Sequence, residues 1–535
     1  MSTFKFSKYN SRRSDVLGSN GSIATSHPLA ANAGLDILKK GGNAVDAAIA
    51  AAAVLNVVEP MSTGIGGDVF SLLYLNNESK VIALNGSGKT GSKVNYKYFI
   101  ENDYKEIPFE GPNSGLSVSV PGAVDAWEEL SKKYGNFSLD TLLVPAIDLA
   151  NNGFPVSEVI ADYWSKSEKK LSINDNCDFL INNKSPKFGE TFFNKNLAKV
   201  LKGIADNGKN FFYQGSVPKN IISYLDKFNG VLTEEDFYNH ESEWVKPISI
   251  NYKGYDVWEC PPNGQGIAAL IALNIFENFN DLDNEYLKLH YQIESIKIAF
   301  KDALWHVSDP KFYKTPIDQL LSKKYATERF NDIDSNIAKD DYEAAKMKSH
   351  GDTVYISVVD KEGNACSFIN SLFQSFGSGL VIPNHGLAMN NRGSLFSLEE
   401  NHPNKLEPLK RPYNTIIPSL ITMNNELFSC LGVMGGFQQP QGHLQVISNM
   451  VDLKMTPQSA LDAPRFNYDP FSGIINLEET FNEDTYEKLI KLRHDIKVLK
   501  GYEKGAFGGG QAINKYLNTF IAGSDPRKDG LALSY

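Results

Sequence analysis

The chain contains little cysteine and little excess positive charge for its length. It has 4 cysteines in 535 residues, and their scattered positions suit neither a zinc site nor a disulfide scaffold. We therefore expect buried free thiols, no metal and no cofactor. The net charge is −10, and no run of Lys or Arg is longer than a pair. A nucleic-acid-binding protein usually carries a basic patch, so we expect no nucleic-acid partner.

Long hydrophobic runs are also missing. The longest one, Ala47–Val58, is short for a membrane span and contains Asn56. The first ten residues are polar and lack the apolar stretch of a secretory signal. These absences predict a protein of the cytoplasm that does not cross or bind a membrane.

The composition that is present is typical of a globular protein. Hydrophobic residues make up 42% of the chain and charged residues 22%. A chain of 535 residues can bury a large core, and its length alone suggests several domains.

Both halves of the chain contain hairpin patterns next to helical patterns. In the first half, residues 29–40 and 45–57 have helical character, with Gly41-Gly42 as a C-cap and Asn43 as an N-cap. After a glycine-rich turn, residues 69–75 and 80–84 form a predicted hairpin. The second half has predicted strands at 354–359, 365–369, 415–422 and 427–434, followed by a helix at 441–453. This pattern favours stacked sheets with helices outside.

Thr353 has the most informative surroundings in the chain. It follows Gly351-Asp352 and opens an alternating strand that ends in a turn at Asp360–Asn364. If the bond before Thr353 is cut, one residue carries both a hydroxyl nucleophile and an amine base, which activates a weak oxygen nucleophile. The alternative is that Thr353 simply opens a strand, as β-branched residues often do.

The order of many short motifs resembles the gamma-glutamyltransferase (glutathione hydrolase) family of N-terminal nucleophile hydrolases. The similarity runs from about Ser26 to Tyr535. It is carried by Gly41–Ala48, Gly64–Gly67, Val120–Val124, Asp352-Thr353, Ser357–Asp360, Gly363–Ala365, Lys410–Pro412, Met434–Gly436, Ala463–Arg465 and Ser524–Arg527.

The resemblance implies an α+β fold, an αββα sandwich made by two interlocked pieces of one precursor. It implies autocatalytic cleavage between Asp352 and Thr353. Residues 1–352 would then be the large subunit and 353–535 the small one, neither stable alone, together one domain. On this point the resemblance replaces the several domains that length suggested.

The same resemblance assigns catalytic roles. Thr353 is the nucleophile, and its α-amine, with an ordinary pKa of roughly 7.7–8.0, takes the proton. Backbone N–H groups at Gly435-Gly436 hold the oxyanion. Ser371 stands where relatives commonly have a threonine that hydrogen-bonds the nucleophile. The alternatives are an ordinary strand-end turn at the glycine pair and a packing hydroxyl at Ser371.

The chain departs from the family where the substrate's amino-acid group is bound. The usual arginine that clamps the α-carboxylate falls on Ser87, and Lys89 is the nearest cation. Lys89 lacks the bidentate fork that suits a carboxylate. An asparagine of the family falls on Phe373, and the aspartate that pairs with the α-amine falls on Leu395. The pocket is therefore expected to be more apolar than usual.

Other positions keep or add polar groups. Arg392 stands where many relatives have glutamine, as a cation for an acidic substrate or as part of a structural salt bridge. The two serines that help to hold the α-carboxylate fall on Asn414 and Thr415, which still offer hydrogen bonds. The segment from Phe396 to Arg411 is shorter than the loop that usually closes over the pocket.

Three functions follow from this pattern. The leading hypothesis is an autoprocessed threonine hydrolase that cleaves γ-glutamyl or similar acidic amides, with hydrolysis favoured over transfer to an acceptor. The second is an acylase or amidohydrolase acting on another acidic amide, such as a glutaryl or oxamate-type amide. The third is an unprocessed, inactive binding protein. The expected partners are a small acidic amide and the other cleaved subunit.

Overall fold

Two stacked antiparallel sheets form the centre of the molecule in a computed structural model, which describes residues 13–339 and 351–535. Each sheet has seven strands. In spatial order, the first contains β1 (Val16–Gly18), β20 (Thr519–Ser524), β19 (Gly509–Tyr516), β15 (Glu426–Met434), β14 (Ser419–Met423), β9 (Tyr255–Glu259) and β8 (Ile248–Tyr252). The second contains β21 (Leu531–Ser534), β2 (Ser22–Thr25), β10 (Gly351–Val359), β11 (Ala365–Gln374), β3 (Asp68–Leu75), β4 (Lys80–Gly86) and β7 (Glu243–Val245).

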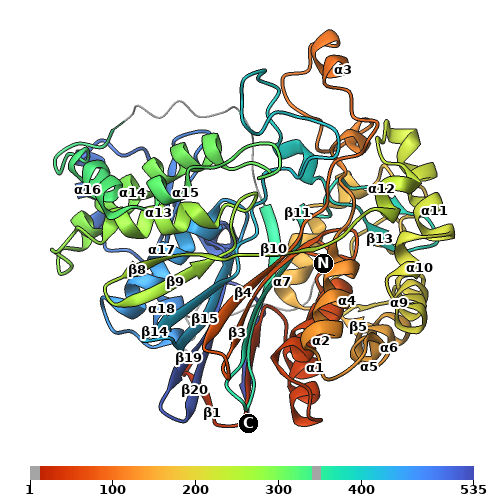
Figure 1. Cartoon of the computed structure of the whole chain (residues 1–535), viewed down its shortest axis with the longest axis horizontal. Coiled ribbons are helices and arrows are strands. Elements are labelled where there is room, and N and C mark those ends of the chain that lie inside the picture. The colour runs from red at the N-terminus through yellow and green to blue at the C-terminus, as the bar shows by residue number, and fades with distance from the viewer. Residues whose placement is uncertain (1–12, 340–350) are drawn as a thin grey trace.

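Helices cover the outer face of each sheet (Figure 1). Helix α2 packs on β10 and β11, and α13 and α17 pack on β8 and β15 of the other sheet. The first layer includes α1 (Pro28–Lys39), α2 (Ala44–Val58), α4 (Ala123–Tyr134), α6 (Val144–Asn152), α9 (Lys195–Asn207) and α11 (Ser216–Leu225). The second includes α13 (Gly266–Phe276), α14 (Glu285–His306), α16 (Lys323–Asn331), α17 (Gln438–Val451), α18 (Pro457–Asp462) and α19 (Glu483–Lys491). The predicted αββα sandwich is confirmed.

Both sheets combine strands from the two sides of Thr353. Hairpin β10–β11 lies between β2 and β3 in the middle of its sheet, and β8 and β9 pair with the later strand β14. Because a central hairpin supplies hydrogen bonds to both neighbours, the segments before and after Thr353 depend on each other for backbone pairing.

Helix α2 shows why the sequence folds as predicted here. Asn43 accepts hydrogen bonds from the N–H groups of Val45 and Asp46, and the Asp46 carboxylate accepts one from the Asn43 N–H. This reciprocal capping satisfies donors that a helix start otherwise leaves free. All residues of α2 are buried, which explains a run of alanines that lets the helix approach the sheet closely.

Two of the predicted strand bounds differ clearly from the structure. The expected strand 415–422 begins only at Ser419, because residues 415–417 form hydrogen bonds with side chains of neighbouring segments instead of with a sheet. Strand β11 continues to Gln374, five residues beyond the expected end, 369. Both differences bring polar residues to one end of the sandwich.

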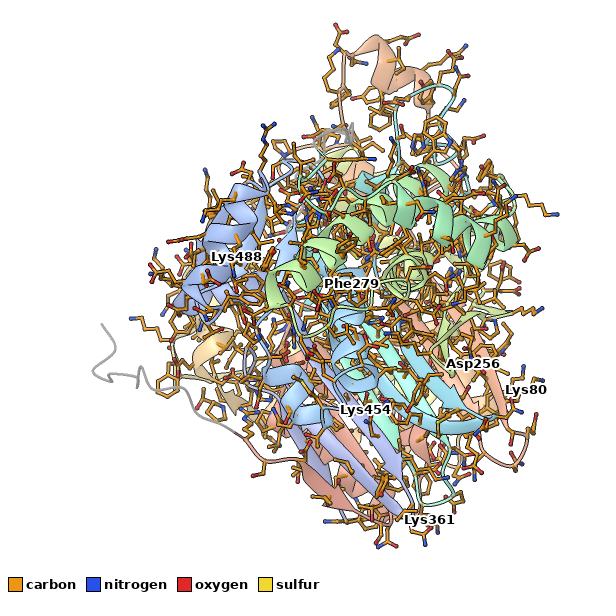
Figure 2. The ribbon with its side chains drawn as sticks, turned by 90° about the vertical axis from the view of Figure 1, so that its left-hand side faces the viewer. Lys80, Asp256, Phe279, Lys361, Lys454 and Lys488 are labelled. Carbon is orange, nitrogen blue, oxygen red and sulfur yellow. The ribbon has the colours of Figure 1, made fainter. Side chains whose placement is uncertain are left out.

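The opposite end of the sandwich consists of exposed turns. Lys361, in the turn between β10 and β11, lies at its tip, and Lys80 begins β4 nearby (Figure 2). Three small units complete the fold. One has three strands, β16 (Phe466–Tyr468), β17 (Ile475–Glu478) and β18 (Ile496–Leu499), and the other two are the pairs β5 (Phe154–Pro155) with β6 (Thr191–Phe192) and β12 (Val381–Ile382) with β13 (Leu387–Ala388). In the described ranges, none of the helices combines the length and apolar character that a bilayer crossing requires.

Candidate active site

Thr353 lies in a β-bulge. In the β10–β11 pair, Asp352 faces Phe373 and Val354 faces Asn370, so two residues of β11, Ser371 and Leu372, lie opposite Thr353 alone. Thr353 is fully buried. A bulge bends its strand and re-aims side chains, and here it brings two hydroxyl side chains together.

Ser371 is bonded to the predicted nucleophile. Its Oγ lies 3.2 Å from Thr353 Oγ1 and accepts the Phe373 N–H at 2.8 Å. Either hydroxyl of this pair can donate to the other. Phe373 adopts a φ of +81°, a strained conformation for a bulky residue of the kind found at functional sites.

The glycine pair lies next to this hydroxyl pair. Gly435 and Gly436 follow β15 with φ values of +123° and +59°, and α17 begins two residues later. Among the described residues, neither glycine N–H donates a hydrogen bond to the protein. The positive end of the α17 dipole adds to these free donors, so the turn offers a favourable site for a developing oxyanion.

Two buried glutamines, to which the sequence analysis gave no role, connect these parts. Gln439, in the first turn of α17, lies 3.5 Å from Thr353 Oγ1 through Nε2 and accepts the Ile417 N–H at 2.9 Å. Gln265 Nε2 donates to the carbonyl oxygens of Gly436 at 2.9 Å and Thr415 at 2.7 Å. A side-chain amide that ties two loops together has no sequence signal of its own.

Arg392 is a fully buried cation in the same region. Its Nη1 donates to Thr415 Oγ1 at 2.7 Å, its Nε is 3.6 Å from Asp68 Oδ2, and its guanidinium stacks 4.8 Å from the Phe373 ring centre. Burial lowers the pKa of Arg392 to about 10. Within the described part of the chain, Nε and Nη2 have no hydrogen-bond acceptor. Arg392 thus forms a loose ion pair with Asp68, and two of its nitrogen atoms remain able to donate hydrogen bonds.

Asp68 completes this region, although the sequence analysis assigned it no role. It pairs across the sheet with Ser371, accepts the Gly88 N–H at 3.0 Å and accepts Asn414 Nδ2 at 3.2 Å. Burial raises the pKa of Asp68 to about 6, although the charge of Arg392 opposes this change. The signal in the sequence that could have identified Asp68 is its place directly after a glycine-rich turn.

Ser87 and Leu395, which are expected to replace the family's α-carboxylate arginine and α-amine aspartate, have other contacts. Ser87 Oγ donates to Asn85 Oδ1 at 2.7 Å, and its carbonyl accepts Arg411 Nε at 3.0 Å. Leu395 is buried in an apolar cluster together with Phe373. Lys89 is half-buried, and this burial lowers its pKa. Arg411, a buried cation next to Ser87, was not expected from the sequence as a site residue.

The glycine motifs of the first half allow backbones to touch around the site. A Cβ on Gly67 would lie 2.2 Å from the Ser371 carbonyl oxygen, one on Gly88 1.6 Å from that of Val120, and one on Gly122 1.9 Å from that of Gly86. No side chain fits such spaces, so these positions require glycine.

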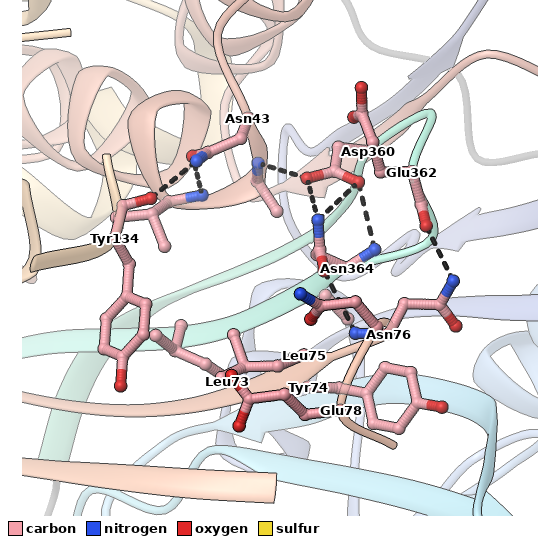
Figure 3. Close-up of a pocket in the computed structure, with 14 residues that line it drawn as sticks. Asn43, Leu73, Tyr74, Leu75, Asn76, Glu78, Tyr134, Asp360, Glu362 and Asn364 are labelled. Carbon is pink, nitrogen blue, oxygen red and sulfur yellow. Dashed lines mark hydrogen bonds between the residues drawn. The ribbon is translucent and has the colours of Figure 1, made fainter. Parts of the chain in front are cut away.

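A cavity of about 370 Å³ lies elsewhere, at the far end of β10 (Figure 3). Its wall includes Asp360, whose carboxylate accepts the N–H groups of Ala44 at 3.1 Å and Asn364 at 3.0 Å. These bonds fix the turn and the start of α2. The cavity does not contain any of the predicted site residues.

One group in the described ranges has the composition of a metal site: His290, Glu294 and His494. His290 Nδ1 and His494 Nε2 are hydrogen-bonded at 2.8 Å, and Lys297 Nζ lies 2.7 Å from Glu294 Oε1. The lysine ammonium therefore already supplies the positive charge that a metal ion would bring.

Comparison with known proteins identifies the family. The gamma-glutamyltranspeptidase family model matches residues 30–535. The chain belongs to the gamma-glutamyltranspeptidase family. It is accordingly a gamma-glutamyltransferase-like N-terminal nucleophile hydrolase, of the autocatalytic proenzyme type.

Three similar proteins show the range of this family. The Glutathione hydrolase-like YwrD proenzyme of Bacillus subtilis is 37% identical, covering 97% of this chain and 99% of that protein. The Oxamate amidohydrolase proenzyme of Klebsiella pneumoniae is 30% identical, covering 98% of this chain and 100% of that protein. The crystal structure of a cephalosporin acylase from Bacillus halodurans has a TM-score of 0.92 and 41% identity, covering 100% of this chain and 99% of that one.

Proposed function

We propose that this member of the gamma-glutamyltranspeptidase family cleaves itself between Asp352 and Thr353 and then hydrolyses amides of acidic acyl groups. The observation that carries the proposal is Arg392, a buried cation that contacts Thr415 and Phe373 and whose Nε and Nη2 have no hydrogen-bond acceptor among the described residues. A guanidinium with free donors is suited to a carboxylate. The acylase and amidohydrolase among the similar proteins support a range of acyl groups wider than γ-glutamyl.

The proposed chemistry has two stages. In the precursor, Thr353 Oγ1 attacks the Asp352 carbonyl carbon, the peptide nitrogen leaves as an amine, and water opens the resulting ester. In the mature enzyme, the freed α-amine takes the Thr353 hydroxyl proton as Oγ1 attacks the substrate carbonyl. The N–H groups of Gly435 and Gly436 stabilise the oxyanion, the amine product leaves with a proton, and water hydrolyses the acyl-enzyme.

Ser371 and Gln439 have supporting roles in this scheme. Both contact Thr353 Oγ1, the Ser371 hydroxyl at 3.2 Å and the Gln439 amide nitrogen Nε2 at 3.5 Å. Hydrogen bonds of this kind orient the hydroxyl of the nucleophile, which fixes its attack geometry. Asn414 and Thr415 act indirectly, because they bond to Asp68 and Arg392 respectively.

Recognition of the acyl group depends on the Arg392–Asp68 pair and the apolar residues beside it. Phe373 and Leu395 offer no polar partner to a substrate α-amine through their side chains. We therefore expect weak discrimination between γ-glutamyl and glutaryl amides. One observation favours a γ-glutamyl preference instead: Asp68 is a carboxylate 3.6 Å from Arg392, so the pair presents both charges that an α-amino acid group needs.

The decisive measurement is kcat/KM for matched γ-glutamyl and glutaryl anilides, with wild-type enzyme and Asp68→Asn. Weak discrimination predicts ratios close to 1 in both proteins. If Asp68 binds the α-amine, wild type prefers the γ-glutamyl anilide by roughly 10⁴-fold, since a site built for a polar group rejects analogues that lack it. Asp68→Asn then removes that preference.

The role of Arg392 is tested with Arg392→Gln against an acidic and a neutral anilide. Loss of the guanidinium should raise KM for the acidic anilide roughly 10-fold or more and leave the neutral one nearly unchanged. Arg392→Gln combined with Asp68→Asn controls for the buried carboxylate that the single change leaves uncompensated. Equal losses for both anilides would assign Arg392 a structural role.

The preference for water over an acceptor amine is part of the same proposal. Its support is the short segment from Phe396 to Arg411, which is bonded to other parts of the chain. Tyr96 Oη donates to the Leu398 carbonyl at 2.8 Å, and Ser308 Oγ donates to the Pro403 carbonyl at 2.9 Å. If water is the preferred acceptor, adding a dipeptide amine should change the products little. The ratio of free acid to transfer product measures this.

A further inference from the structure

Two sequence motifs of the family, Ala463–Arg465 and Ser524–Arg527, have no role in the proposed chemistry. In the structure they meet in one buried ion network. Arg465 Nη2 is 2.5 Å from Asp525 Oδ2, Arg527 Nη1 is 3.1 Å from Asp525 Oδ1, and Arg527 also pairs with Glu478. Arg465, Asp525 and Glu478 are at most 3% exposed.

The charges of this network are balanced, two guanidinium groups against two carboxylates. Burial alone disfavours the Asp525 carboxylate, but Arg465 and Arg527 hold its pKa below the usual value. A buried ion network of this kind contributes little net stability compared with apolar packing. We therefore ask which part of the backbone the network holds in place.

The network is attached to the start of β19 from two sides. Arg465 Nη1 donates to the Phe507 carbonyl at 3.0 Å, and the Asp525 carboxylate accepts the Gly510 N–H at 2.7 Å. The Asp525 N–H also donates to the Gly510 carbonyl at 3.0 Å. Gly508 and Gly509 lie between these fixed points and have little freedom to move.

This fixed stretch lies directly against the proposed oxyanion turn. Gly509 pairs with Met434, the residue before Gly435. A Cβ on Gly435 would be 3.2 Å from Gly508 Cα, and one on Gly508 would be 2.2 Å from the Met434 carbonyl oxygen. Any displacement of Gly508 therefore moves the backbone at Gly435.

We propose that Arg465 and Asp525 are positioning residues for the oxyanion turn. They fix the position of Gly508–Gly510. This position in turn orients the N–H groups of Gly435 and Gly436 toward the reacting carbonyl oxygen. The inference rests on the proposed role of that glycine pair. Small displacements of preorganised donors reduce transition-state stabilisation more than substrate binding, because the donors act on charge that develops in the transition state.

The test uses Arg465→Lys and Asp525→Asn in cleaved enzyme, with active sites counted by acylation. Lysine can reach Asp525 or the Phe507 carbonyl but lacks the fork that reaches both. We expect kcat to fall roughly 10- to 100-fold, less than for outright removal of a donor. KM should stay within about 2-fold because ground-state binding is unchanged.

Inhibition by two compounds separates positioning from general damage. A boronate that forms a tetrahedral adduct with Thr353 should bind more weakly by the same factor as kcat, while the carboxylic acid product should bind as to wild type. The control is Glu294→Gln, which breaks another buried pair, Glu294–Lys297, on a helix remote in sequence from the turn. It should lower the melting temperature without changing kcat.

Three results would overturn the proposal: unchanged kcat in both variants, equal weakening of the boronate and the product acid, or failure of both variants to give cleaved protein while Glu294→Gln succeeds. The last result would assign the network to folding alone. Failure of the proposed function is a separate outcome, since it requires that wild-type enzyme hydrolyse none of the acidic amides.

Discussion

At the scale of single residues, the site depends on the contact between the hydroxyl groups of Thr353 and Ser371. Thr353 and Ser371 are adjacent only because β11 has an extra residue opposite Thr353. Ser371 Oγ also accepts the Phe373 N–H at 2.8 Å. The positive φ of Phe373 is the conformational cost of this arrangement.

The nucleophile assignment predicts the fate of the precursor. Thr353→Ala lacks the attacking oxygen and should remain a single chain on a denaturing gel, while Thr353→Ser keeps a hydroxyl and should still be cut. N-terminal sequencing of the small wild-type fragment should begin at Thr353. A wild-type protein that stays whole, or a fragment with another first residue, would contradict the assignment.

At the scale of elements, the proposed oxyanion turn links a strand to a helix. Gly435 and Gly436 leave β15 with positive φ, and α17 begins two residues after Gly436. The turn therefore combines the positive end of a helix dipole with two N–H groups that donate to no acceptor in the part of the chain that the structure describes. Gln265, from the segment before α13, holds the Gly436 carbonyl and so fixes the other side of the same residue.

The turn predicts a catalytic defect from a small substitution. Gly436→Ala introduces a side chain at φ +59° and should shift the N–H donors, and loss of one such donor raises the barrier by roughly 2.7–4 kcal/mol. The matched control is Gly473→Ala, at φ +78° in an open surface turn with no heavy atom near the added Cβ.

Both substitutions should destabilise the protein to a similar degree, roughly 1 kcal/mol, because alanine is strained at positive φ. Only Gly436→Ala should lower kcat in the cleaved enzyme. If Gly436→Ala turns over at the wild-type rate, the turn does not hold the oxyanion.

At the scale of the whole molecule, the two sides of Thr353 are interlocked. Each sheet contains strands from both, and β10–β11 is central in its sheet. Another connection lies away from the site. His290 on α14 bonds to His494, which follows α19, and to the Asp334 carbonyl, each at 2.8 Å. These bonds connect α14 with the segment around Asp334, which precedes the proposed cleavage site in the sequence.

The histidine contact predicts loss of stability in acid. Burial, with the charge of Lys297 nearby, lowers the pKa of His494 to about 2. Below pH 6.5 the unfolded chain therefore binds a proton that the folded chain excludes, so stability falls as the pH falls. At pH 5 this effect amounts to about 2 kcal/mol relative to neutral pH.

Thermal unfolding at pH 7.5 and pH 5 checks this expectation. His494→Gln can still donate to His290 and should show a smaller loss of melting temperature in acid than wild type. His385→Gln, at a half-exposed histidine, is the control and should behave like wild type. An identical acid shift in all three proteins would show that other groups govern the pH dependence.

The sequence by itself determined the local elements and supplied the residues proposed for the centre of the site. The capped helix at Ala44–Val58, the hairpin after Thr353 and the glycine pair all follow from short-range chemistry: side-chain periodicity, capping residues and glycine turns. The order of the motifs then indicated the αββα fold, because it resembles the order found in one family and members of a family share their fold.

Only the tertiary structure decided which distant groups meet. The bulge opposite Thr353, the pairing of Asp68 with Arg392 and the use of Gln265 and Gln439 as ties depend on strand register and on how the two sheets close. A one-residue change in register turns every side chain to the other face of a sheet, so no local pattern can specify such contacts. For the same physical reason, the network of Arg465 and Asp525 became visible only when residues 60 positions apart in sequence lay 2.5 Å apart.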